Sequence, residues 1–388
     1  MRFSGFTDEW NEVKIVDISK SITKGTTPKK YSDTGINFVK VESIENNKIY
    51  KIDAFIDENT HKNELSRSIL KTNDLLFSIA GSLGRTTIVT ENILPANTNQ
   101  ALSIIRFYDN CNCNLKFIQS RLNTYDIAKY IFQNLAVGAQ PNLNLQQVGN
   151  IKIRIPSFNE QNKIQGFLEC VDIKIELLKK KYQYYQEFKK YLMQQIFTQK
   201  LRFDDNCQYK TKQVKDFLIE SKIEGIDDIN KRLTVKLNLK GITVRESKTI
   251  EIEGATKQFI RKTGQFIYGK QNLHKGAFGI VPKELDGYLT SSDIPSFDFK
   301  EGIEPKWFYY YFARKSFYEK LENLSTGTGS KRISPKEFLN IKIIVPEFKE
   351  QHKIVCLLEK FDEKINEISN QIVQMNMFKK SLLQQMFV

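Results

Sequence analysis

The run of residues that most invites a chemical interpretation is GQFIYGKQ at 264–271. Its first seven positions fit the phosphate-binding loop G-x-x-x-x-G-K, whose backbone amides wrap a phosphate. The eighth residue of such a loop is Ser or Thr, which holds magnesium, but here it is Gln271. The intervening Gln, Phe, Ile and Tyr are typical of a strand, not of a pliable loop. We therefore predict a strand here and no nucleotide site.

Residues suited to metal binding and acid–base chemistry are sparse. Cys111 and Cys113 form a single pair, whereas a structural zinc needs about four ligands, and the nearest histidine in sequence is His61. His352 aligns with Asn162 in an internal repeat, which favours a role at a helix start. All 9 prolines are isolated, so the Pro-Pro-aromatic motif of amino-group methyltransferases is absent. The sequence predicts no catalytic residue, no metal site and no enzymatic activity.

Length and charge bound the remaining possibilities. With 388 residues, the chain is too long for one ordinary core and suggests about two globular units. Its net charge of +14 fits a polyanionic partner, although a solvated basic surface has the same balance. No run of about 18 apolar residues exists, so we expect no membrane span. The N-terminus lacks an apolar signal core and the 5 cysteines are scattered, so we expect a cytoplasmic protein with reduced thiols.

The chain contains a duplication. Residues 150–197 align without a gap with residues 340–387, a shift of 190, and 22 of these 48 positions are identical. NIKIRIPSFNEQNKI at 150–164 returns as NIKIIVPEFKEQHKI at 340–354. Upstream the match weakens: KTNDLLF at 71–77 meets KTGQFIY at 262–268, and residues 19–70 have no convincing counterpart. Shared ends indicate a shared structural role, and divergent middles indicate that the two halves recognise different things.

Each repeat ends in a predicted long helix. Apolar residues recur at alternating spacings of four and three, the pattern of a coiled-coil seam. A helix of about 40 residues, about 60 Å long, is unstable alone when it buries only a narrow stripe. We expect the two helices to pair antiparallel around a pseudo-twofold axis; packing of each on its own globular domain is the alternative. The seam residues are Ile164, Leu168, Val171, Ile175 and Leu178, and Ile354, Leu358, Phe361, Ile365 and Ile368.

The rest of the sequence predicts two globular domains of mixed α/β class. Strand-length runs rich in β-branched and aromatic residues lie at 74–81, 100–107, 264–269 and 278–282, and helical stretches at 115–134 and 305–322. Loops rich in Gly, Thr, Asn and Lys separate these elements, and such loops usually carry recognition. The predicted boundaries are a first domain at 1–155, a helix at 156–203, a second domain at 204–345 and a helix at 346–388.

Together these features resemble the DNA specificity subunit of type I restriction–modification systems, over essentially the whole chain. The resemblance implies two target-recognition domains, each of which reads one half of an asymmetric bipartite DNA site. It implies that the helix pair sets the distance between the half-sites. The matching segments are GTTP at 25–28, DLLFS at 74–78, GSLG at 81–84, NQ at 99–100, the two P-x-F-x-E-Q-x-K-I segments at 156–164 and 346–354, and LMQQIF at 192–197.

The resemblance also implies partners. Besides double-stranded DNA, these are two adenine methyltransferase subunits, docked on the helices, and two endonuclease–translocase subunits, so that the assembly carries out adenine methylation and restriction. S-adenosylmethionine, magnesium and ATP would belong to those partners, and the specificity subunit itself would hold no cofactor.

We expect DNA to be bound by side chains on the loops. Lys and Arg would contact phosphates, and Arg, Lys, Asn, Gln, Ser and Thr would reach base edges. The second domain lacks a counterpart of the GTTP loop, so that loop's implied role is not transferred to it. The candidates are Lys24, Thr27, Lys29, Lys30, Arg85, Asn99, Gln140 and Asn142 in the first domain, and Arg261, Lys262, Lys270, Asn272, Lys275, Ser330, Lys331 and Arg332 in the second.

Two other hypotheses remain open at this point. A non-catalytic coiled-coil adaptor would tether two identical proteins through the duplicated helices and would ignore duplex DNA. A nuclease or ATPase with an unrecognised site would turn over its substrate without partners. The sequence does not reveal the target bases, the spacer length or whether a restriction subunit accompanies the methyltransferase.

Overall fold

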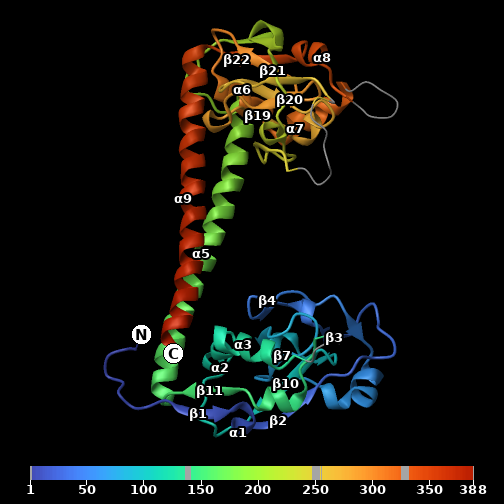
Figure 1. The fold of residues 1–388 in the computed structure, drawn as a ribbon, viewed down its shortest axis with the longest axis vertical. Coiled ribbons are helices and arrows are strands. Elements are labelled where there is room, and N and C mark those ends of the chain that lie inside the picture. The colour runs from blue at the N-terminus through green and yellow to red at the C-terminus, as the bar shows by residue number, and fades with distance from the viewer. Residues whose placement is uncertain (1, 136–140, 247–253, 255, 325–331, 388) are drawn as a thin grey trace. The chain divides into compact units, whose positions relative to one another are not determined.

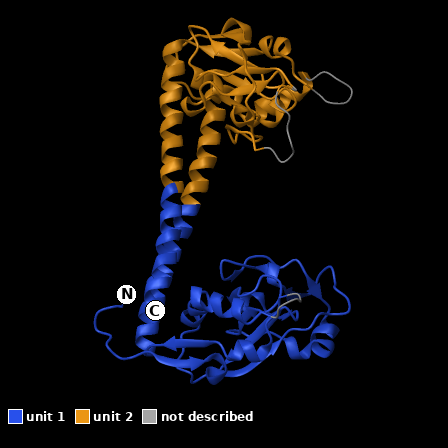
Figure 2. Ribbon diagram, viewed as in Figure 1, with its two compact units in different colours: residues 1–179, 370–388 blue, residues 180–369 orange. Residues whose placement is uncertain are grey.

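The computed structural model describes residues 2–135, 141–246, 254, 256–324 and 332–387 (Figure 1). The chain divides into two compact units, residues 1–179 with 370–388 and residues 180–369 (Figure 2). Two long helices, α5 (Phe158–Phe197) and α9 (Phe348–Met386), are shared, so each unit holds a stretch of both. We call the globular part of unit 1 domain 1 and that of unit 2 domain 2.

Domain 1 is built on a four-stranded antiparallel sheet with the order β2 (Ser19–Lys24), β10 (Leu102–Phe107), β7 (Leu75–Ser78) and β8 (Thr86–Ile88). Leu75 and Phe77 belong to a core that includes residues of helices α2 (Leu115–Leu122) and α3 (Tyr125–Gln133) and of α5. Leu76, at the alternate position, belongs to a second core under the smaller strands. Burial on both faces explains why β7 is apolar along most of its length.

Smaller elements complete domain 1. A three-stranded sheet has the order β6 (Phe55–Ile56), β3 (Ile36–Val39) and β9 (Ala96–Thr98), with β3 and β9 parallel. A hairpin of β4 (Ile44–Glu45) and β5 (Lys48–Ile49) lies beside β8. The ribbon of β1 (Asn11–Lys14) and β11 (Lys152–Ile155) leads into α5. The short helices are α1 (Ile15–Ile18), α4 (Leu145–Gly149), η1 (Val41–Ser43), η2 (Thr60–Glu64), η3 (Ser66–Ser68) and η4 (Glu91–Ile93).

Domain 2 repeats this sheet with other residues, in the order β13 (Leu218–Ser221), β21 (Ser296–Phe299), β18 (Phe266–Tyr268) and β19 (Phe278–Ile280). The same turn enters the third strand in both domains. The backbone N–H of Lys71 donates to Asp74 Oδ2 at 2.8 Å, and that of Lys262 donates to Gln265 Oε1 at 2.9 Å. The core of domain 2 is largely aromatic and includes Trp307 from α6 (Pro305–Phe312).

The smaller elements of domain 2 differ from those of domain 1. Its second sheet, β14 (Glu224–Gly225), β17 (Gln258–Ile260) and β20 (Leu289–Ser291), is wholly antiparallel, and a hairpin forms from β15 (Leu233–Val235) and β16 (Ile242–Val244). The predicted divergence of the middles therefore lies in the second sheet. The remaining elements are the ribbon of β12 (Tyr209–Gln213) and β22 (Lys342–Pro346), and the helices α7 (Lys315–Tyr318), α8 (Pro335–Leu339), η5 (Val214–Asp216), η6 (Ile229–Lys231), η7 (Leu273–Lys275), η8 (Lys283–Leu285) and η9 (Glu319–Leu324).

Two predicted helices are broken. The stretches 115–134 and 305–322 lie where helices form, but each splits into α2 and α3 or into α6 and α7. In domain 1 the break is at Thr124, whose backbone is extended and whose hydroxyl bonds Asp126 Oδ1 at 2.5 Å. Arg121 bonds both oxygens of the same carboxylate, at 2.7 and 2.5 Å. The Thr124 hydroxyl also donates to the backbone carbonyl of Arg121 at 2.7 Å. A hydroxyl that bonds a carbonyl of the preceding turn competes with the helical hydrogen-bond pattern, and the helix restarts after Thr124.

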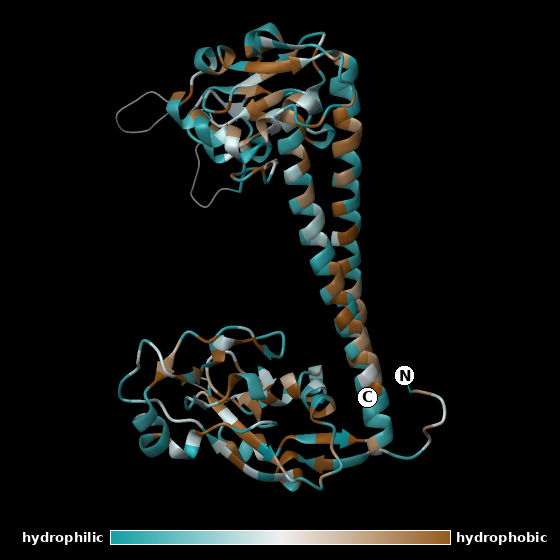
Figure 3. Ribbon diagram, turned by 180° about the vertical axis from the view of Figure 1, so that it is seen from behind, coloured by the Kyte–Doolittle hydropathy of each residue, from teal (hydrophilic) through white to brown (hydrophobic). Residues whose placement is uncertain are grey.

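The two long helices pair antiparallel, as predicted. In unit 1 the beginning of α5 packs with the end of α9, and in unit 2 the end of α5 packs with the beginning of α9. Brown and teal segments alternate along both helices in Figure 3, as expected when one side of a helix is apolar. The predicted seam is buried except at Phe361 and Ile365, which are half-buried. Ile164 and Leu168 also join the core of domain 1, so the alternative packing holds for the first turns of α5.

One ion pair occurs twice in the helix pair. Asp172 of α5 meets Lys379 of α9 at 2.5 Å in unit 1, and Lys189 meets Asp362 at 2.5 Å in unit 2. The shift of 190 relates Asp172 to Asp362 and Lys189 to Lys379. The same two repeat positions therefore meet in both units, which is the pairing that a duplicated antiparallel helix predicts.

Candidate nucleic-acid interface

In domain 1 the loops at one end of the four-stranded sheet gather most of the predicted DNA-contacting residues. β2 and β7 end here, and β10 and β8 begin here, because the strands are antiparallel. Backbone hydrogen bonds join the loops: Thr26 N–H to Thr98 O at 3.0 Å, Ile79 N–H to Ala101 O at 2.8 Å and Leu143 N–H to Ile79 O at 2.9 Å. We call this region, residues 25–30, 79–85, 99–101 and 142, loop end 1.

The GTTP segment is held tightly in loop end 1. A Cβ atom on Gly25 would lie 2.1 Å from Asn99 O, so only glycine permits this approach of two backbone segments. The hydroxyl of Thr27 bonds the side-chain oxygen of Gln100, and the backbone N–H of Ala101 donates to Asn99 Oδ1 at 3.1 Å. Gln100 therefore positions Thr27, a role that inspection of single residues did not predict.

The other candidates of domain 1 have different environments. Lys24, Lys29 and Lys30 are exposed, as are Thr27 and Asn142, and Asn99 is half-buried. Arg85 donates from Nη1 to Val41 O at 3.3 Å and to Ile44 O at 3.0 Å, which fixes the backbone just before the β4–β5 hairpin. Gln140 lies outside the described residues.

Domain 2 has the equivalent loop end. Lys270 N–H donates to Asp293 O at 2.9 Å, Ile333 N–H donates to Lys270 O at 2.9 Å, and Arg332 pairs with Asp293 at 3.1 Å. These contacts bring together Lys270, Asn272, Lys275 and Arg332 from segments far apart in the sequence. We call residues 222–223, 269–277, 292–295 and 332 loop end 2. Ser330 and Lys331 lie outside the described residues.

Two candidates of domain 2 are not exposed in loop end 2: Arg261 is buried against it, and Lys262 lies away from it. Arg261 is 1% exposed, and its guanidinium donates to Thr290 Oγ1 at 2.5 Å, Ser296 Oγ at 2.6 Å and Ile294 O at 3.1 Å. Burial lowers its pKa to about 10, so it stays charged at neutral pH among neutral acceptors, and its position argues against a DNA contact. Lys262 precedes β18 and therefore sits at the opposite end of the sheet from loop end 2.

The segments considered for catalysis carry other structures. Three of the four residues between Gly264 and Gly269 form a strand, β18, as predicted, and burial strongly raises the pKa of Tyr268. Cys113 donates to the carbonyl of Cys111 at 3.0 Å, and burial raises its pKa to about 12, which keeps this thiol protonated. In the described part of the chain, no three His, Cys, Asp or Glu side chains are grouped for a metal ion. No helix within the described ranges is long and apolar enough to cross a bilayer.

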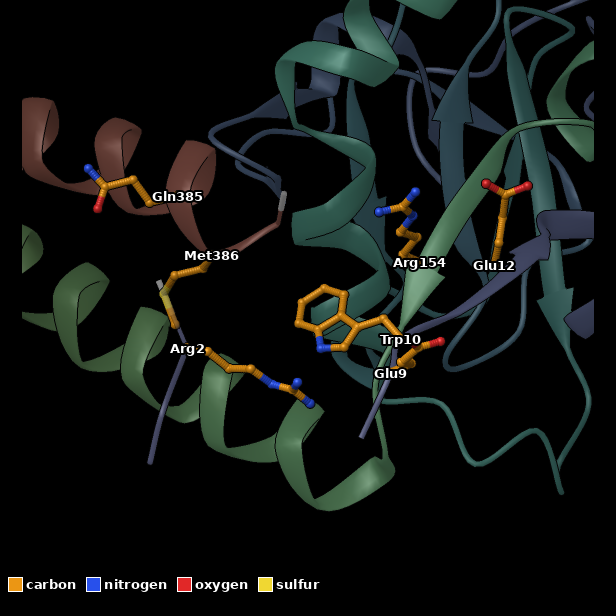
Figure 4. A pocket seen from close by; sticks show the side chains of 7 residues that line it. All are labelled: Arg2, Glu9, Trp10, Glu12, Arg154, Gln385 and Met386. Carbon is orange, nitrogen blue, oxygen red and sulfur yellow. The ribbon is translucent and has the colours of Figure 1, made fainter. Parts of the chain in front are cut away.

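A cavity of about 590 Å³ lies in unit 1, away from loop end 1 (Figure 4). Arg2 binds both oxygens of Glu160, at 2.7 and 2.8 Å, and Glu12 pairs with Lys152 at 2.8 Å. Two of the four charged residues that line the cavity, Arg2 and Glu12, therefore already have partners in the protein. The lining residues are Arg2, Glu9, Trp10, Glu12, Arg154, Gln385 and Met386.

The repeated E-Q segments fasten each domain to its helix. Gln161 donates to Pro156 O at 3.0 Å and to Asn112 O at 3.2 Å, and accepts from Asn114 N–H at 2.9 Å. Gln351 donates to Pro346 O at 3.0 Å and to Gly302 O at 3.3 Å, and accepts from Glu304 N–H at 2.8 Å. All partners are related by the shift of 190. The E-Q residues are identical in the two repeats, and this identity is the sequence signal that points to their role.

Comparison with known proteins identifies the family. A family model described as "Type I restriction modification DNA specificity domain" matches residues 7–184 and again residues 208–375. The chain belongs to this family. The type I specificity subunits are non-catalytic, since methylation and cleavage lie in partner subunits, and a specificity subunit implies DNA, methyltransferase and restriction partners.

Individual specificity subunits are similar to this chain, either over nearly its whole length or over part of it. The "Putative type I restriction enzyme MjaX specificity subunit" of Methanocaldococcus jannaschii is 23% identical over 404 residues, 97% of this chain and 92% of the relative. The EcoBI specificity subunit of Escherichia coli is 26% identical over 40% of this chain and 34% of its own. The crystal structure of the HsdS subunit from Thermoanaerobacter tengcongensis has a TM-score of 0.56 at 13% identity, with 98% of this chain and 97% of that chain covered, and supports the fold.

Proposed function

We propose that loop end 1 and loop end 2 each read one half of a bipartite, asymmetric DNA site. The observation that carries this proposal is that one sheet, with one strand order, presents two different sets of polar and basic loops. Exposed lysines would contact phosphates and fix the register, while Asn, Thr and Arg side chains would reach base edges. The reading residues would be Lys24, Thr27, Lys29, Lys30, Arg85, Asn99 and Asn142 in domain 1, and Lys270, Asn272, Lys275 and Arg332 in domain 2.

The helix pair would dock the catalytic partners. Both helices expose large apolar side chains outside the seam: Ile173 and Leu177 of α5 are 57% and 56% exposed, and Val373 and Met377 of α9 are 55% and 67% exposed. Such side chains on an exposed helix favour a protein partner. The four exposed apolar residues are not themselves repeated, since the shift of 190 relates Ile173 and Leu177 to Glu363 and Glu367. Two methyltransferase subunits and two restriction subunits would complete the assembly, as the resemblance to the family implies. S-adenosylmethionine, magnesium and ATP would be held by those partners.

Methylation mapping tests the proposal most directly. Modified adenines would be mapped in a cell that expresses this chain with its methyltransferase, and again after deletion of this gene. The expected result is a two-part motif that disappears with the gene. Exchange of residues 204–345 for those of a relative should change one half of the motif only. An active methyltransferase whose motif does not depend on this chain would favour the adaptor hypothesis instead.

A single substitution tests the assignment of half-sites. Arg85→Ala removes from loop end 1 a side chain that holds the backbone at Val41 and Ile44. We expect weaker or relaxed reading of one half of the motif, with the other half unchanged. Arg332→Ala is the matched variant in loop end 2 and should affect the opposite half. Equal losses in both halves for either variant would indicate general destabilisation.

A further inference from the structure

We propose that the tip of the β15–β16 hairpin, residues 236–241, binds DNA phosphates as part of domain 2. The binding groups are Lys236 and Lys240 of the tip together with Lys275 of loop end 2. This inference rests on the proposed function, because it adds an element to the surface that would read DNA. Only Lys275 is predicted from the sequence.

Backbone contacts place the hairpin tip at loop end 2. The N–H of Asn238 donates to Lys275 O at 2.9 Å, and the N–H of Leu239 donates to Gly276 O at 2.9 Å. Residues 275–276 lie two positions before β19, which begins at this end of the sheet. The tip therefore joins the same group of loops as Lys270.

The tip is held in one conformation. Asn238 and Leu239 have φ values of 57° and 58°, a left-handed conformation that residues other than glycine rarely adopt, least of all consecutively. Leu239 packs against the aromatic core of domain 2, and a Cβ atom on Gly276 would lie 3.3 Å from its backbone nitrogen. Strained backbone of this kind persists only where its surroundings impose it, and it concentrates at functional sites. A preformed loop also loses little freedom when it binds.

The charges of the tip have no counter-ion in the chain as described. Lys236, Lys240 and Lys275 are exposed, and no ion pair joins any of them to a described carboxylate. Other lysines of domain 2 do have such partners, for example Lys222 with Glu220 at 2.9 Å. Like charges gathered on one rigid loop repel each other, and a polyanion relieves that repulsion.

The comparable hairpin of domain 1 shares the left-handed turn but lacks the unpaired lysines. The β4–β5 turn also contains two consecutive left-handed residues, Asn46 and Asn47, with φ values of 50° and 62°. Its tip is neutral, however, and Gln119 donates to Asn47 O at 3.0 Å. The nearest lysine, Lys48, pairs with Glu176 of α5 at 2.7 Å. The phosphate contact is therefore a property of domain 2 alone.

The salt dependence of DNA binding tests this inference. The complex of the full chain with its methyltransferase would be titrated onto a duplex that carries the mapped motif, at several salt concentrations. Each phosphate contact contributes about 0.9 to the slope of log affinity against log salt. Lys236→Ala with Lys240→Ala should therefore reduce the slope by about two. An unchanged slope would overturn the inference.

Matched controls separate this effect from a general loss of charge. Lys215→Ala with Lys283→Ala removes two exposed lysines from the opposite end of the same sheet, and Lys48→Ala removes the paired lysine of domain 1. Neither should change the slope, and an equal change would refute a local contact. As a second readout, DNA should protect Lys236 and Lys240, but not Lys215 and Lys283, from acetylation in the unmutated complex. If the unmutated complex binds no duplex, the proposed function itself fails, and this inference fails with it.

Discussion

Domain 1 and domain 2 share one sheet but stabilise it with different chemistry. At the entry to the third strand, the carboxylate of Asp74 in domain 1 forms two bonds with Arg106 of the neighbouring strand, both at 2.6 Å. In domain 2 the same place holds Gln265, which donates to Asp298 at 2.8 Å. The cross-strand link has been kept while the residue types and charges have changed. The four-stranded sheet therefore needs a hydrogen bond between these two strands at this position, but it does not need a particular pair of residues.

The side of each domain that meets the helices is different, because there the residues themselves are repeated. Gln161 and Gln351 make the same three contacts in their two domains, and the Asp–Lys pair of the helices occurs twice. The glutamines fasten each domain to its helix, and the Asp–Lys pairs join the two helices to each other. The comparison therefore separates a part of the fold that must stay the same from a part that is free to vary.

The largest expected effect tests the repeated side. The side chain of Gln161 is 2% exposed. Gln161→Ala therefore leaves two backbone carbonyls and one backbone N–H without the hydrogen-bond partner that this side chain provides. Each unsatisfied buried group costs about 1–3 kcal/mol, so we expect a loss of about 3 kcal/mol. Hydrogen exchange read separately over each domain would measure it. Gln351→Ala should cause an equal loss in domain 2, and unequal losses would break the equivalence of the two sites.

The next prediction concerns the cross-strand link at the entry to the third strand, where the two domains use different residues. Asp74 is 1% exposed, so Asp74→Ala should cost about 2 kcal/mol, because Arg106 then keeps only its contact with the carbonyl of Ile69. Gln265→Ala should cost less, about 1 kcal/mol, because no buried ion pair is broken. Urea unfolding would measure both. Asp74→Gln with Arg106→Asp puts the pair of domain 2 into domain 1 and should recover part of the loss; no recovery would mean that the two links are not interchangeable.

The duplicated ion pair provides a finer test. Lys189 has 13% of its side chain exposed and lies 4.6 Å from the ring centre of Tyr310, whose hydroxyl donates to Asp362 at 2.6 Å. Burial lowers the pKa of Lys189, and the hydrogen bond to Asp362 opposes that shift. Lys379 is more exposed and lacks such an aromatic contact within the described residues. Lys189→Ala should cost about 1–2 kcal/mol and Lys379→Ala less than about 1 kcal/mol, by thermal unfolding; the reverse order would contradict this account.

The smallest effect concerns a surface ion pair that joins α2 to α5. Glu169 pairs with Lys116 at 2.7 Å, and that hydrogen bond lowers the pKa of Glu169 from 4.5. Because the folded pKa lies below the unfolded value, the stabilisation is present above about pH 4.5 and is lost as the pH falls through the folded pKa. Glu169→Gln should therefore cost less than about 0.5 kcal/mol at pH 7 and nothing in strong acid. A difference that grows in acid would reverse the assigned sign.

The sequence predicts the helix pair well because its signal is local and periodic. The 4-3 spacing needs no knowledge of the rest of the fold, and the main strands were visible from their composition for a similar reason. The breaks at Thr124 and at 313–314 are not predicted by the sequence, because each is a local change to extended backbone, at Thr124 and at Arg314, that the spacing of apolar residues does not reveal. Arg261 was misjudged because an arginine among neutral acceptors looks, in sequence, like an exposed one.

The candidate site was only partly predictable because it is assembled from distant segments. Lys24 and Asn142 come together only through the pairing of β2, β10 and β7 and the bonds of residue 143. The hairpin tip lies more than thirty residues from Lys275 in sequence, and two backbone hydrogen bonds and the packing of Leu239 on the domain core bring them together. The composition of the loops indicates which side chains could bind DNA. Which loops lie next to one another depends on the pairing of the strands and cannot be predicted from composition.

The exposed apolar residues on the helices affect the subunit before it meets any partner. Ile173, Leu177, Val373 and Met377 remain in water when the chain is made in excess. Surfaces of this kind favour self-association and capture by chaperones and proteases. An orphaned copy should therefore be cleared or aggregate, so that the cellular amount of this chain follows the amount of its partners. Synthesis together with those partners is then a condition for obtaining it in a dispersed form.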